Sequence, residues 1–285
     1  MGTKRVPRPF HTDEPMIGPP NYAFDSLRRP RLRKSLFEIE DIRWLQHLGG
    51  GIDGYCWKVA FGDKGPYVVK MFWEDKDPSG FLYWAAEREF QNAAVLQMIE
   101  ASVSDHGDAW VLEEPENGME AIENLYAFSE EGRRKSRIPA GMDGTTRQGV
   151  CRTRKCFGWL KLNSNSFGHW KNKPRPVQID KWRRDSPYPG HEYFAIVYEY
   201  IEEDELDEEN SAEQKEANRR RIGVAMESLW RAGFEFHDTT ILDNWKNGML
   251  IDLCDIVYPY GLGRHLTGFR LKGNANALKR QAPTC

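Results

Sequence analysis

The chain lacks the features that mark membrane-spanning, secreted and metal-stapled proteins. No apolar run in its 285 residues approaches the roughly 18 residues that a membrane helix needs. The stretch from Met1 to Pro9 is basic, without the apolar core of a secretory signal. Neither a disulfide framework nor a zinc site is expected, because the cysteines are odd in number and scattered: Cys56, Cys151, Cys156, Cys254 and Cys285. These absences favour an intracellular protein, nuclear or cytoplasmic, with no membrane partner.

A strong net charge is also missing. The 40 Lys and Arg residues nearly balance the 43 Asp and Glu residues, so the composition gives no strong signal for nucleic-acid binding. Apolar residues are plentiful, and a hydrophobic share of 40% is enough to build a sizeable core. The length allows one large domain or two small ones.

A glycine-rich segment that ends at Lys70 is the most informative part of the chain. Gly49, Gly51 and Gly54 follow the pattern G-x-G-x-x-G, which lets a backbone turn bend tightly over phosphates. Residues 55–61 alternate in polarity, which predicts a strand rather than the helix of a dinucleotide-binding turn. A second strand ends at Lys70, whose ammonium can reach the same phosphates. The segment therefore predicts a strand–loop–strand hairpin over a nucleotide-shaped cleft.

A helix is expected from Ser79 to Ile99, where alanines and apolar residues recur at helical spacing. In kinases, a glutamate on the helix after the lysine strand orients the lysine. We prefer Glu89 as the partner of Lys70, with Glu87 as the alternative, since residues two apart on a helix point in different directions. Surface charge is the simpler interpretation for the other glutamate.

The rest of the chain divides by composition. Residues 1–35 are predicted to form a basic, proline-rich flexible arm. Its cluster at 28–34 is either a nuclear import signal or a solvated basic flank. The acidic run 202–209 is interpreted as a solvated linker. Insertions are expected at 102–149 and 163–190, with a short helix near 119–128 in the first. Further strands are expected at 39–48, 149–162 and 193–201.

The clearest helix runs from Ser211 to Ala232, where the apolar residues recur on one face. Ser211 and Gln214 form a potential capping box at its start. Gly233 is expected to end the helix, because glycine readily takes the left-handed conformation of a helix C-terminus.

A second constellation follows this helix. It resembles a kinase catalytic loop, H-R-D-L-x-x-x-N, with a strand and D-F-G after it. There the first Asp accepts a hydroxyl proton, while the Asn and the second Asp hold Mg²⁺. Asp252 follows a short predicted strand and matches the metal-binding aspartate. A carboxylate among apolar residues is costly without a cation, which a bound metal or Lys70 alone would supply. Asn244, eight positions earlier, is the expected second ligand.

The identity of the general base stays open. Counting five residues back from Asn244 reaches Thr239 rather than Asp238. Either the loop holds one extra residue and Asp238 is the base, or Asp243 stands in place of the Asn, or the base is lost. His237 is expected to have a structural role.

Three groups of motifs carry a resemblance to known families. They are G-G-G-I-D-G-Y-C-W-K-V with Y-V-V-K-M-F, C-F-G-W-L-K-L, and G-F-E-F-H-D-T with N-W-K-N-G-M-L-I-D-L. In this order they resemble the protein-kinase-like superfamily and, within it, the fungal kinetochore Sim-four complex subunit Fta-two family. The resemblance implies an α+β, two-lobed protein-kinase-like fold with a twisted antiparallel N-lobe sheet and a reduced helical C-lobe. It places the N-lobe at 36–201, the C-lobe with the catalytic-loop-like segment at 202–266, and a basic tail at 267–285.

Two departures weaken the catalytic expectation. Only 33 residues follow Asp252, without A-P-E, and D-L-C replaces D-F-G. We therefore expect a divergent kinase or pseudokinase that binds ATP and Mg²⁺ with weak or no phosphotransfer. The site would comprise Gly49, Gly51, Gly54, Lys70 and Glu89 for the nucleotide, Asn244 and Asp252 for the metal, and Asp238 as the base.

Two alternatives remain. The first is a non-enzymatic kinetochore or chromatin scaffold, in which the same elements only support the fold and the basic arm and acidic run contact protein partners. The second is a small-molecule phosphotransferase, since such kinases tolerate a reduced C-terminal lobe.

Overall fold

The computed structural model describes residues 9–78, 83–135, 144–149, 152–185, 187–202, 211–236 and 244–261. The chain divides into two compact units, which are described separately. The first takes the residues up to Gly18, then Arg31–Phe90 and Lys155–Tyr200. The second takes Pro19–Pro30, Gln91–Arg154 and the residues from Ile201 onward.

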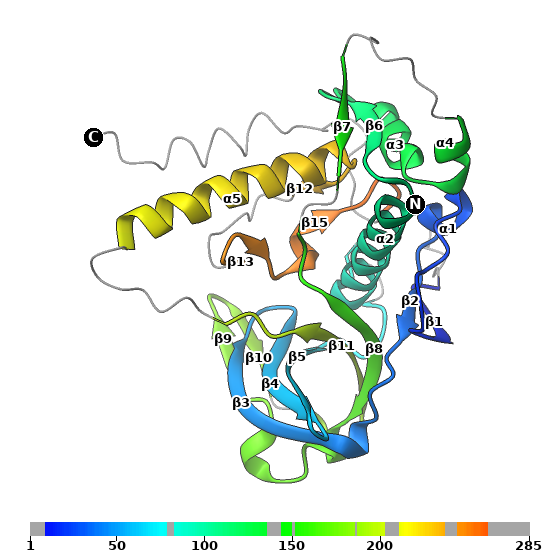
Figure 1. Cartoon of the computed structure of the whole chain (residues 1–285). Coiled ribbons are helices and arrows are strands. Elements are labelled where there is room, and N and C mark those ends of the chain that lie inside the picture. The colour runs from blue at the N-terminus through cyan, green and yellow to red at the C-terminus, as the bar shows by residue number, and fades with distance from the viewer. Residues whose placement is uncertain are drawn as a thin grey trace, which may run out of the picture. The chain divides into compact units, whose positions relative to one another are not determined.

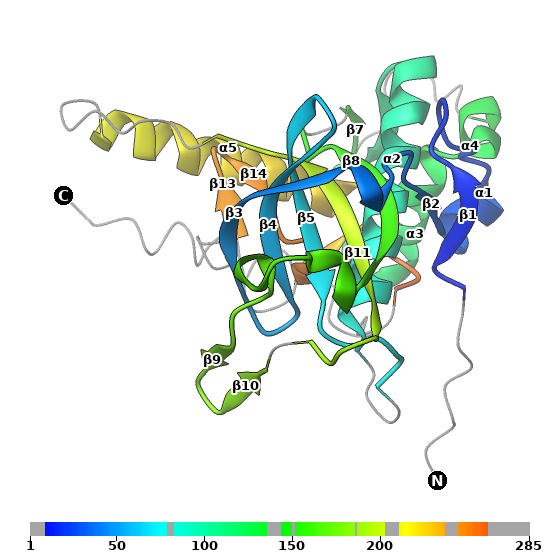
Figure 2. The same ribbon diagram turned by 90° about the horizontal axis from the view of Figure 1, so that it is seen from below.

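A seven-stranded sheet builds the first unit (Figures 1 and 2). The strands from β8 to β3 pair antiparallel, whereas β1 with β2 and β2 with β8 pair in parallel. The prediction of an α+β chain with a mainly antiparallel sheet is confirmed. In order across the sheet the strands are β1 (His11–Pro15), β2 (Leu32–Lys34), β8 (Cys156–Asn163), β11 (Glu192–Glu199), β5 (Lys64–Phe72), β4 (Gly54–Phe61) and β3 (Ile42–Gly50).

The core of this unit lies on one face of the sheet. Inward positions two apart on β4 and β5, such as Trp57, Val59 and Val69, are buried, as the period of a strand requires. The Trp57 ring stacks on Phe167, with centroids 5.4 Å apart. The remaining elements of the unit are η1 (Ile39–Asp41), η2 (Ser164–Phe167), η3 (Trp170–Asn172) and the hairpin of β9 (Val177–Ile179) with β10 (Trp182–Arg184).

The second unit combines helices with three two-stranded pairs. Helix α2 (Ala85–His106) begins in the first unit and belongs to the second from Gln91. The other helices are α1 (Phe24–Arg28), α3 (Gly118–Ala127), α4 (Glu130–Lys135), α5 (Ser211–Arg231) and the short η6 (Leu253–Asp255). The pairs are β6 (Ala109–Leu112) with β7 (Thr145–Gln148), β12 (Glu235–Phe236) with β15 (Ile256–Val257), and β13 (Trp245–Lys246) with β14 (Met249–Leu250).

Helix α5 ends where the sequence predicts. Gly233 has φ +94°, and its N–H donates to the Trp230 carbonyl at 2.8 Å. The Phe234 N–H donates to the Leu229 carbonyl at 3.0 Å. These two bonds form a Schellman motif, which satisfies carbonyls that the helix end would otherwise leave unpaired. The side chain of Ser211, and with it the predicted capping box, lies outside the described part of the chain.

The predicted N-terminal arm contains regular secondary structure from β1 onward. Arg33, in the basic cluster, is buried and donates from Nη1 to the Ile17 carbonyl at 3.0 Å and from Nη2 to the Gly18 carbonyl at 2.9 Å. This arginine therefore has a structural role in the first unit. No helix among the described residues is both long and apolar enough to cross a membrane.

Candidate functional site

The predicted glycine segment forms the turn of the β3–β4 hairpin. The Gly51 N–H donates to the Gly54 carbonyl at 2.9 Å and closes the turn. Gly49 has φ +116°, a conformation that favours glycine. A Cβ at Gly54 would lie 2.2 Å from the Met71 carbonyl oxygen, whereas one at Gly51 would meet nothing within 4 Å. Packing between β4 and β5 therefore explains Gly54 without any ligand.

The tip of this hairpin is fixed through its carbonyl oxygens. The indole N–H of Trp73 donates to Gly51 at 2.9 Å, and its backbone N–H donates to Asp53 at 3.1 Å. Arg184 Nε donates to the Ile52 carbonyl at 2.9 Å. Three consecutive carbonyls thus bond within the first unit, and no sequence motif identifies Trp73 or Arg184 in this role.

Lys70 lies on β5, opposite Cys56 on β4 and Ile196 on β11. Its Nζ is 2.6 Å from Glu89 Oε2 at the start of α2, and only 6% of the Lys70 side chain and none of the Glu89 side chain are exposed. The structure therefore pairs Lys70 with the preferred glutamate, nineteen residues later.

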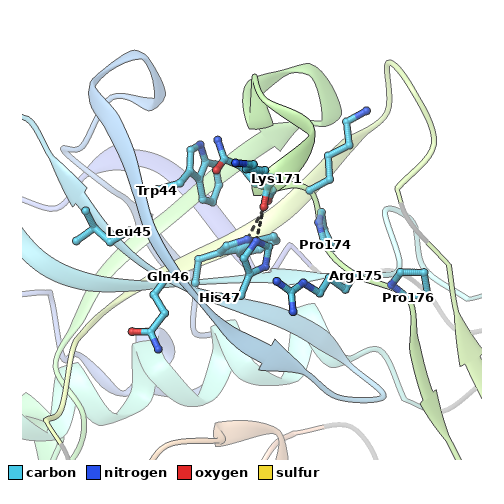
Figure 3. Close-up of a pocket in the computed structure, with 11 residues that line it drawn as sticks. Trp44, Leu45, Gln46, His47, Lys171, Pro174, Arg175 and Pro176 are labelled. Carbon is cyan, nitrogen blue, oxygen red and sulfur yellow. Dashed lines mark hydrogen bonds between the residues drawn. The ribbon is translucent and has the colours of Figure 1, made fainter.

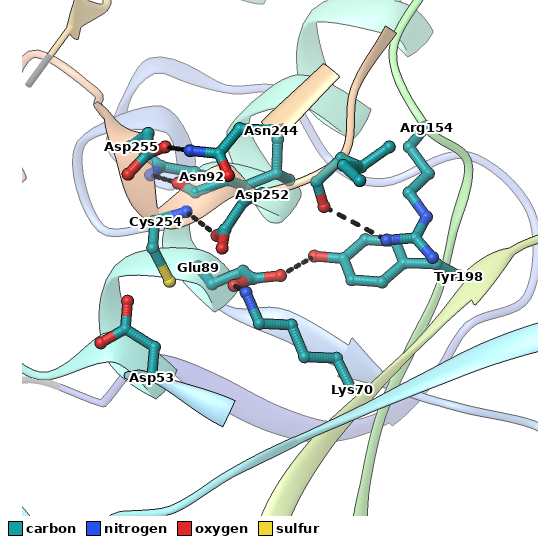
Figure 4. A network of polar contacts seen from close by, with 12 residues as sticks. Asp53, Lys70, Glu89, Asn92, Arg154, Tyr198, Asn244, Asp252, Cys254 and Asp255 are labelled. Atoms are coloured by element: carbon teal, nitrogen blue, oxygen red, sulfur yellow. Dashed lines mark hydrogen bonds and ion pairs between the residues drawn. The ribbon is translucent and has the colours of Figure 1, made fainter. Parts of the chain in front are cut away.

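Tyr198 completes this buried cluster. Its hydroxyl donates to Glu89 Oε1 at 2.8 Å, so each carboxylate oxygen of Glu89 has a donor (Figure 4). Satisfying both oxygens is what a buried carboxylate requires. The same arrangement can fix the direction of a phosphate-binding lysine or serve only to hold β5, β11 and α2 together.

The two predicted metal ligands lie at one end of the β13–β14 hairpin. Asn244 immediately precedes β13, and its carbonyl accepts the Ile251 N–H at 2.8 Å. Asp252 Oδ1 accepts the Cys254 N–H at 3.0 Å and caps η6. The Asn244 amide nitrogen donates to Asp255 Oδ2 (Figure 4). Both side chains therefore make contacts within the second unit that need no metal.

Asn92 is a positioning residue that sequence reasoning missed. It is fully buried, and its Nδ2 donates to the Leu253 carbonyl at 2.8 Å and the Ile256 carbonyl at 2.6 Å. Its Oδ1 accepts the Tyr258 N–H at 3.2 Å. These bonds hold the segment after Asp252 against α2. No motif in the sequence identifies it, because its partners are backbone groups more than 160 residues away.

The predicted base Asp238 lies outside the described residues, as do His237 and the alternative Asp243. Its role stays a prediction from the sequence.

Comparison with known proteins identifies a family whose model matches most of the chain. A family model described as Kinetochore Sim4 complex subunit FTA2 matches residues 12–257. No curated protein matches the chain. The matched range contains the glycine hairpin, the Lys70 cluster and the β13–β14 hairpin.

Proposed function

The chain belongs to the family of kinetochore Sim4 complex subunit FTA2, and from this we propose that it is a kinetochore subunit that binds protein partners and does not act by catalysis. The match over residues 12–257 carries the proposal, because it includes most of both units. As a kinetochore subunit the protein works in the nucleus, and its partners are other proteins of the same assembly.

The contacts of the candidate site support a structural use of its residues. The Asn244 amide donates to Asp255, and Asp252 caps η6. The carbonyls of the glycine turn accept bonds from Trp73 and Arg184. Each of these groups has a role in stabilising the fold.

Chromatin immunoprecipitation of the tagged full-length chain tests the kinetochore proposal. We expect centromeric DNA to be recovered well above chromosome-arm DNA, with an untagged strain as the control. Equal recovery of the two kinds of DNA, from cells in which the tagged chain is intact and nuclear, would contradict the proposal.

A second function, binding of ATP with Mg²⁺ in a kinase-like fold, is favoured by the buried Lys70–Glu89 pair. Burying two charges costs several kcal/mol, and apolar residues of similar size often serve stability as well or better. A buried pair of this kind suits a role beyond stability, the orientation of Lys70 toward a phosphate. In this proposal Gly49, Gly51, Gly54 and Lys70 hold phosphates, Glu89 orients Lys70, Asn244 and Asp252 hold Mg²⁺, and Asp238 gives weak or no phosphotransfer.

Thermal unfolding with ATP and MgCl₂ tests this second function. A ligand that binds only the native state raises the melting temperature as its concentration exceeds Kd. We expect the shift to disappear in Lys70→Met/Glu89→Gln and in Asp252→Asn, and to persist in the control Lys64→Met, an exposed position on the same strand. A wild-type chain that shows no shift at millimolar ATP would rule out nucleotide binding, and with it a phosphotransferase.

A further inference from the structure

A cavity of about 680 Å³ opens beside β3 in the first unit (Figure 3). Its walls come from the β3 residues Trp44–His47, from Trp57 on β4 and from the segment 171–176. None of these residues belongs to the glycine turn or to the Lys70 cluster. The cavity is therefore a separate feature that the proposed function leaves unused.

The wall formed by segment 171–176 is held in place by side chains of the sheet. His47 Nε2 lies 2.6 Å from the Lys171 carbonyl, and its Nδ1 lies 2.9 Å from the Tyr55 hydroxyl. Because a carbonyl only accepts, Nε2 carries the proton. The Trp57 indole N–H donates to the Asn172 carbonyl at 3.0 Å. Two successive carbonyls are thus bound to β3 and β4, and the cavity is preformed.

The same segment gives the cavity a positive rim. Its sequence is K-N-K-P-R-P, so three exposed cations (Lys171, Lys173 and Arg175) alternate with other residues. Among the described residues no acidic side chain lines the cavity, and neither Lys173 nor Arg175 makes an ion pair there. Arg175 extends back towards His47 (Figure 3). The two prolines restrict the backbone of this segment, which reduces the backbone entropy lost when a partner binds.

The β3 wall of the cavity is mixed, with the apolar Trp44 and Leu45 beside Gln46 and His47. Trp44 pairs with Val59 and Gln46 pairs with Lys58, which leaves Leu45 as the extra residue of a β-bulge. A bulge re-aims a side chain and disrupts pairing at a sheet edge. Leu45 is 50% exposed as a result of its place on this edge strand. A partner would therefore contact side chains here instead of adding a strand.

We propose that this cavity binds an acidic segment of a protein partner in which carboxylates alternate with large apolar side chains. The three cations of segment 171–176 would bind the carboxylates of the partner. Leu45 and the edge of Trp44 would pack against its apolar side chains. Charge complementarity of this kind raises the association rate and selects the partner. The inference rests on the proposed function only in assigning the partner to the kinetochore.

A nucleic-acid ligand fits the cavity less well. Strand-binding proteins stack bases on open aromatic faces. The Trp44 ring already contacts Trp57, with centroids 5.1 Å apart, and Phe167, with centroids 5.4 Å apart. The cations would attract phosphates, but the Trp44 and Trp57 rings already pack on each other and on Phe167.

Fluorescence anisotropy with the purified full-length chain tests the proposal. The probe is a fluorescein-labelled peptide of about twelve residues in which each Glu or Asp is followed by a Leu or Phe. In an extended peptide this alternation places the carboxylates and the apolar side chains on opposite faces. Lys173→Glu/Arg175→Glu should weaken binding at least about tenfold, since rim charges select the partner. The control Lys34→Glu/Lys64→Glu makes the same charge change at two other exposed positions. It should change Kd less than about twofold, because separated surface charges are screened.

A third variant and a second probe complete the test. Leu45→Gln should weaken peptide binding with no change in net charge, because it removes only the apolar contact. Equal weakening by the two charge reversals, or tighter binding of single-stranded DNA of the same length than of the peptide, would overturn the inference. So would absence of peptide binding in wild type. If centromeric enrichment persists in that case, this inference fails alone and the proposed function stands.

Discussion

Lys70, Glu89 and Tyr198 show what a buried ion pair needs at the scale of single residues. Removing both charges from water costs several kcal/mol, and only good geometry with further hydrogen bonds offsets that cost. The 2.6 Å contact between Lys70 Nζ and Glu89 Oε2 provides the geometry. The Tyr198 hydroxyl provides the further hydrogen bond. The pair is therefore stable as a unit, and its members are not independent.

This interdependence gives the first prediction. Lys70→Ala should lower the free energy of unfolding by about 3–5 kcal/mol, because it leaves Glu89 charged and buried. Lys70→Met/Glu89→Gln should cost less than Lys70→Ala, since it leaves no uncompensated buried charge, the methionine fills the space and the glutamine oxygen still accepts the Tyr198 hydroxyl. Urea denaturation measures both variants. Equal losses in the single and double variants would contradict the coupling.

The glycine turn supplies a second prediction, with its own control. Gly54→Ala should destabilise the chain by about 1–3 kcal/mol, because the new methyl would overlap the Met71 carbonyl and force β4 from β5. Gly51→Ala should stay within about 0.5 kcal/mol of wild type, since open space surrounds that position. If both substitutions are tolerated equally, packing does not explain Gly54.

At the scale of elements, a glycine inside α5 and a glycine just after its end have opposite roles. A Cβ at Gly223 would meet nothing within 4 Å, so Gly223→Ala should stabilise the helix by about 0.5–1 kcal/mol. Gly233→Ala should cost more than about 1 kcal/mol, because its φ is +94° and its Cβ would lie 2.4 Å from the Ala121 carbonyl oxygen. Thermal unfolding of both variants checks the signs. A stabilising effect of Gly233→Ala would refute the helix-end assignment.

Strand β1 carries a histidine whose burial makes stability depend on pH. The centroid of the His11 ring lies 4.4 Å from that of Trp159 and 5.2 Å from that of Phe194. Its Nδ1 is buried with no hydrogen-bond partner within the described residues. Burial lowers the pKa of His11, with a further lowering by Lys161 that the Asp13 charge opposes.

The sign of the pH effect follows from this lowered pKa. The unfolded histidine binds a proton near its ordinary pKa of 6.5, while the folded one binds it only at lower pH. The unfolded state therefore binds more protons in that window, and stability falls as pH drops below about 6.5. The uncharged variant His11→Phe should lose this part of the pH dependence. Urea denaturation at pH 7.5 and pH 5.5 measures the free energy of unfolding of wild type and of His11→Phe. If the difference between the two proteins is the same at both pH values, the assignment is contradicted.

Elements with strong local patterns could be predicted from the sequence. Helix α5 and strand β11 lie close to their predicted ranges, because helical periodicity and a continuous apolar run identify them. Helix α2 continues to His106, beyond the predicted Ile99. Its polar end is supported by a tertiary contact, since Tyr22 bonds to Asp105 at 2.9 Å. A local pattern cannot reveal a partner more than eighty residues away.

Strands β1 and β2 could not be predicted for the same reason. The sequence H-T-D-E-P is polar and has a proline, so nothing local indicates a strand. The pairing depends on distant residues, including the Trp159 indole N–H, which donates to the Thr12 carbonyl at 2.8 Å. In the candidate site, Lys70 and Glu89 could be predicted because motif spacing identifies them. Asn92 and Asp255 belong to no motif and appear only once the chain is folded.

At the scale of the whole molecule, the family assignment and the site geometry support the same function. The matched range, residues 12–257, includes both units. Asn244 and Asp252, the two side chains that a kinase would direct to a metal, bond to Asp255 and to the Cys254 N–H within the second unit. The central proposal, which this family membership supports, is that the chain serves the kinetochore as a folded protein-binding subunit.

Replacement of the resident gene by the Lys70→Met/Glu89→Gln/Asp252→Asn variant tests this claim most directly, with fluorescence imaging at the centromere as the measurement. The protein level of the variant, measured in the same cells, controls for folding. We expect the variant to give centromeric foci and growth equal to wild type. Loss of the foci or of growth, at a normal protein level, would contradict the claim and indicate that nucleotide chemistry is required.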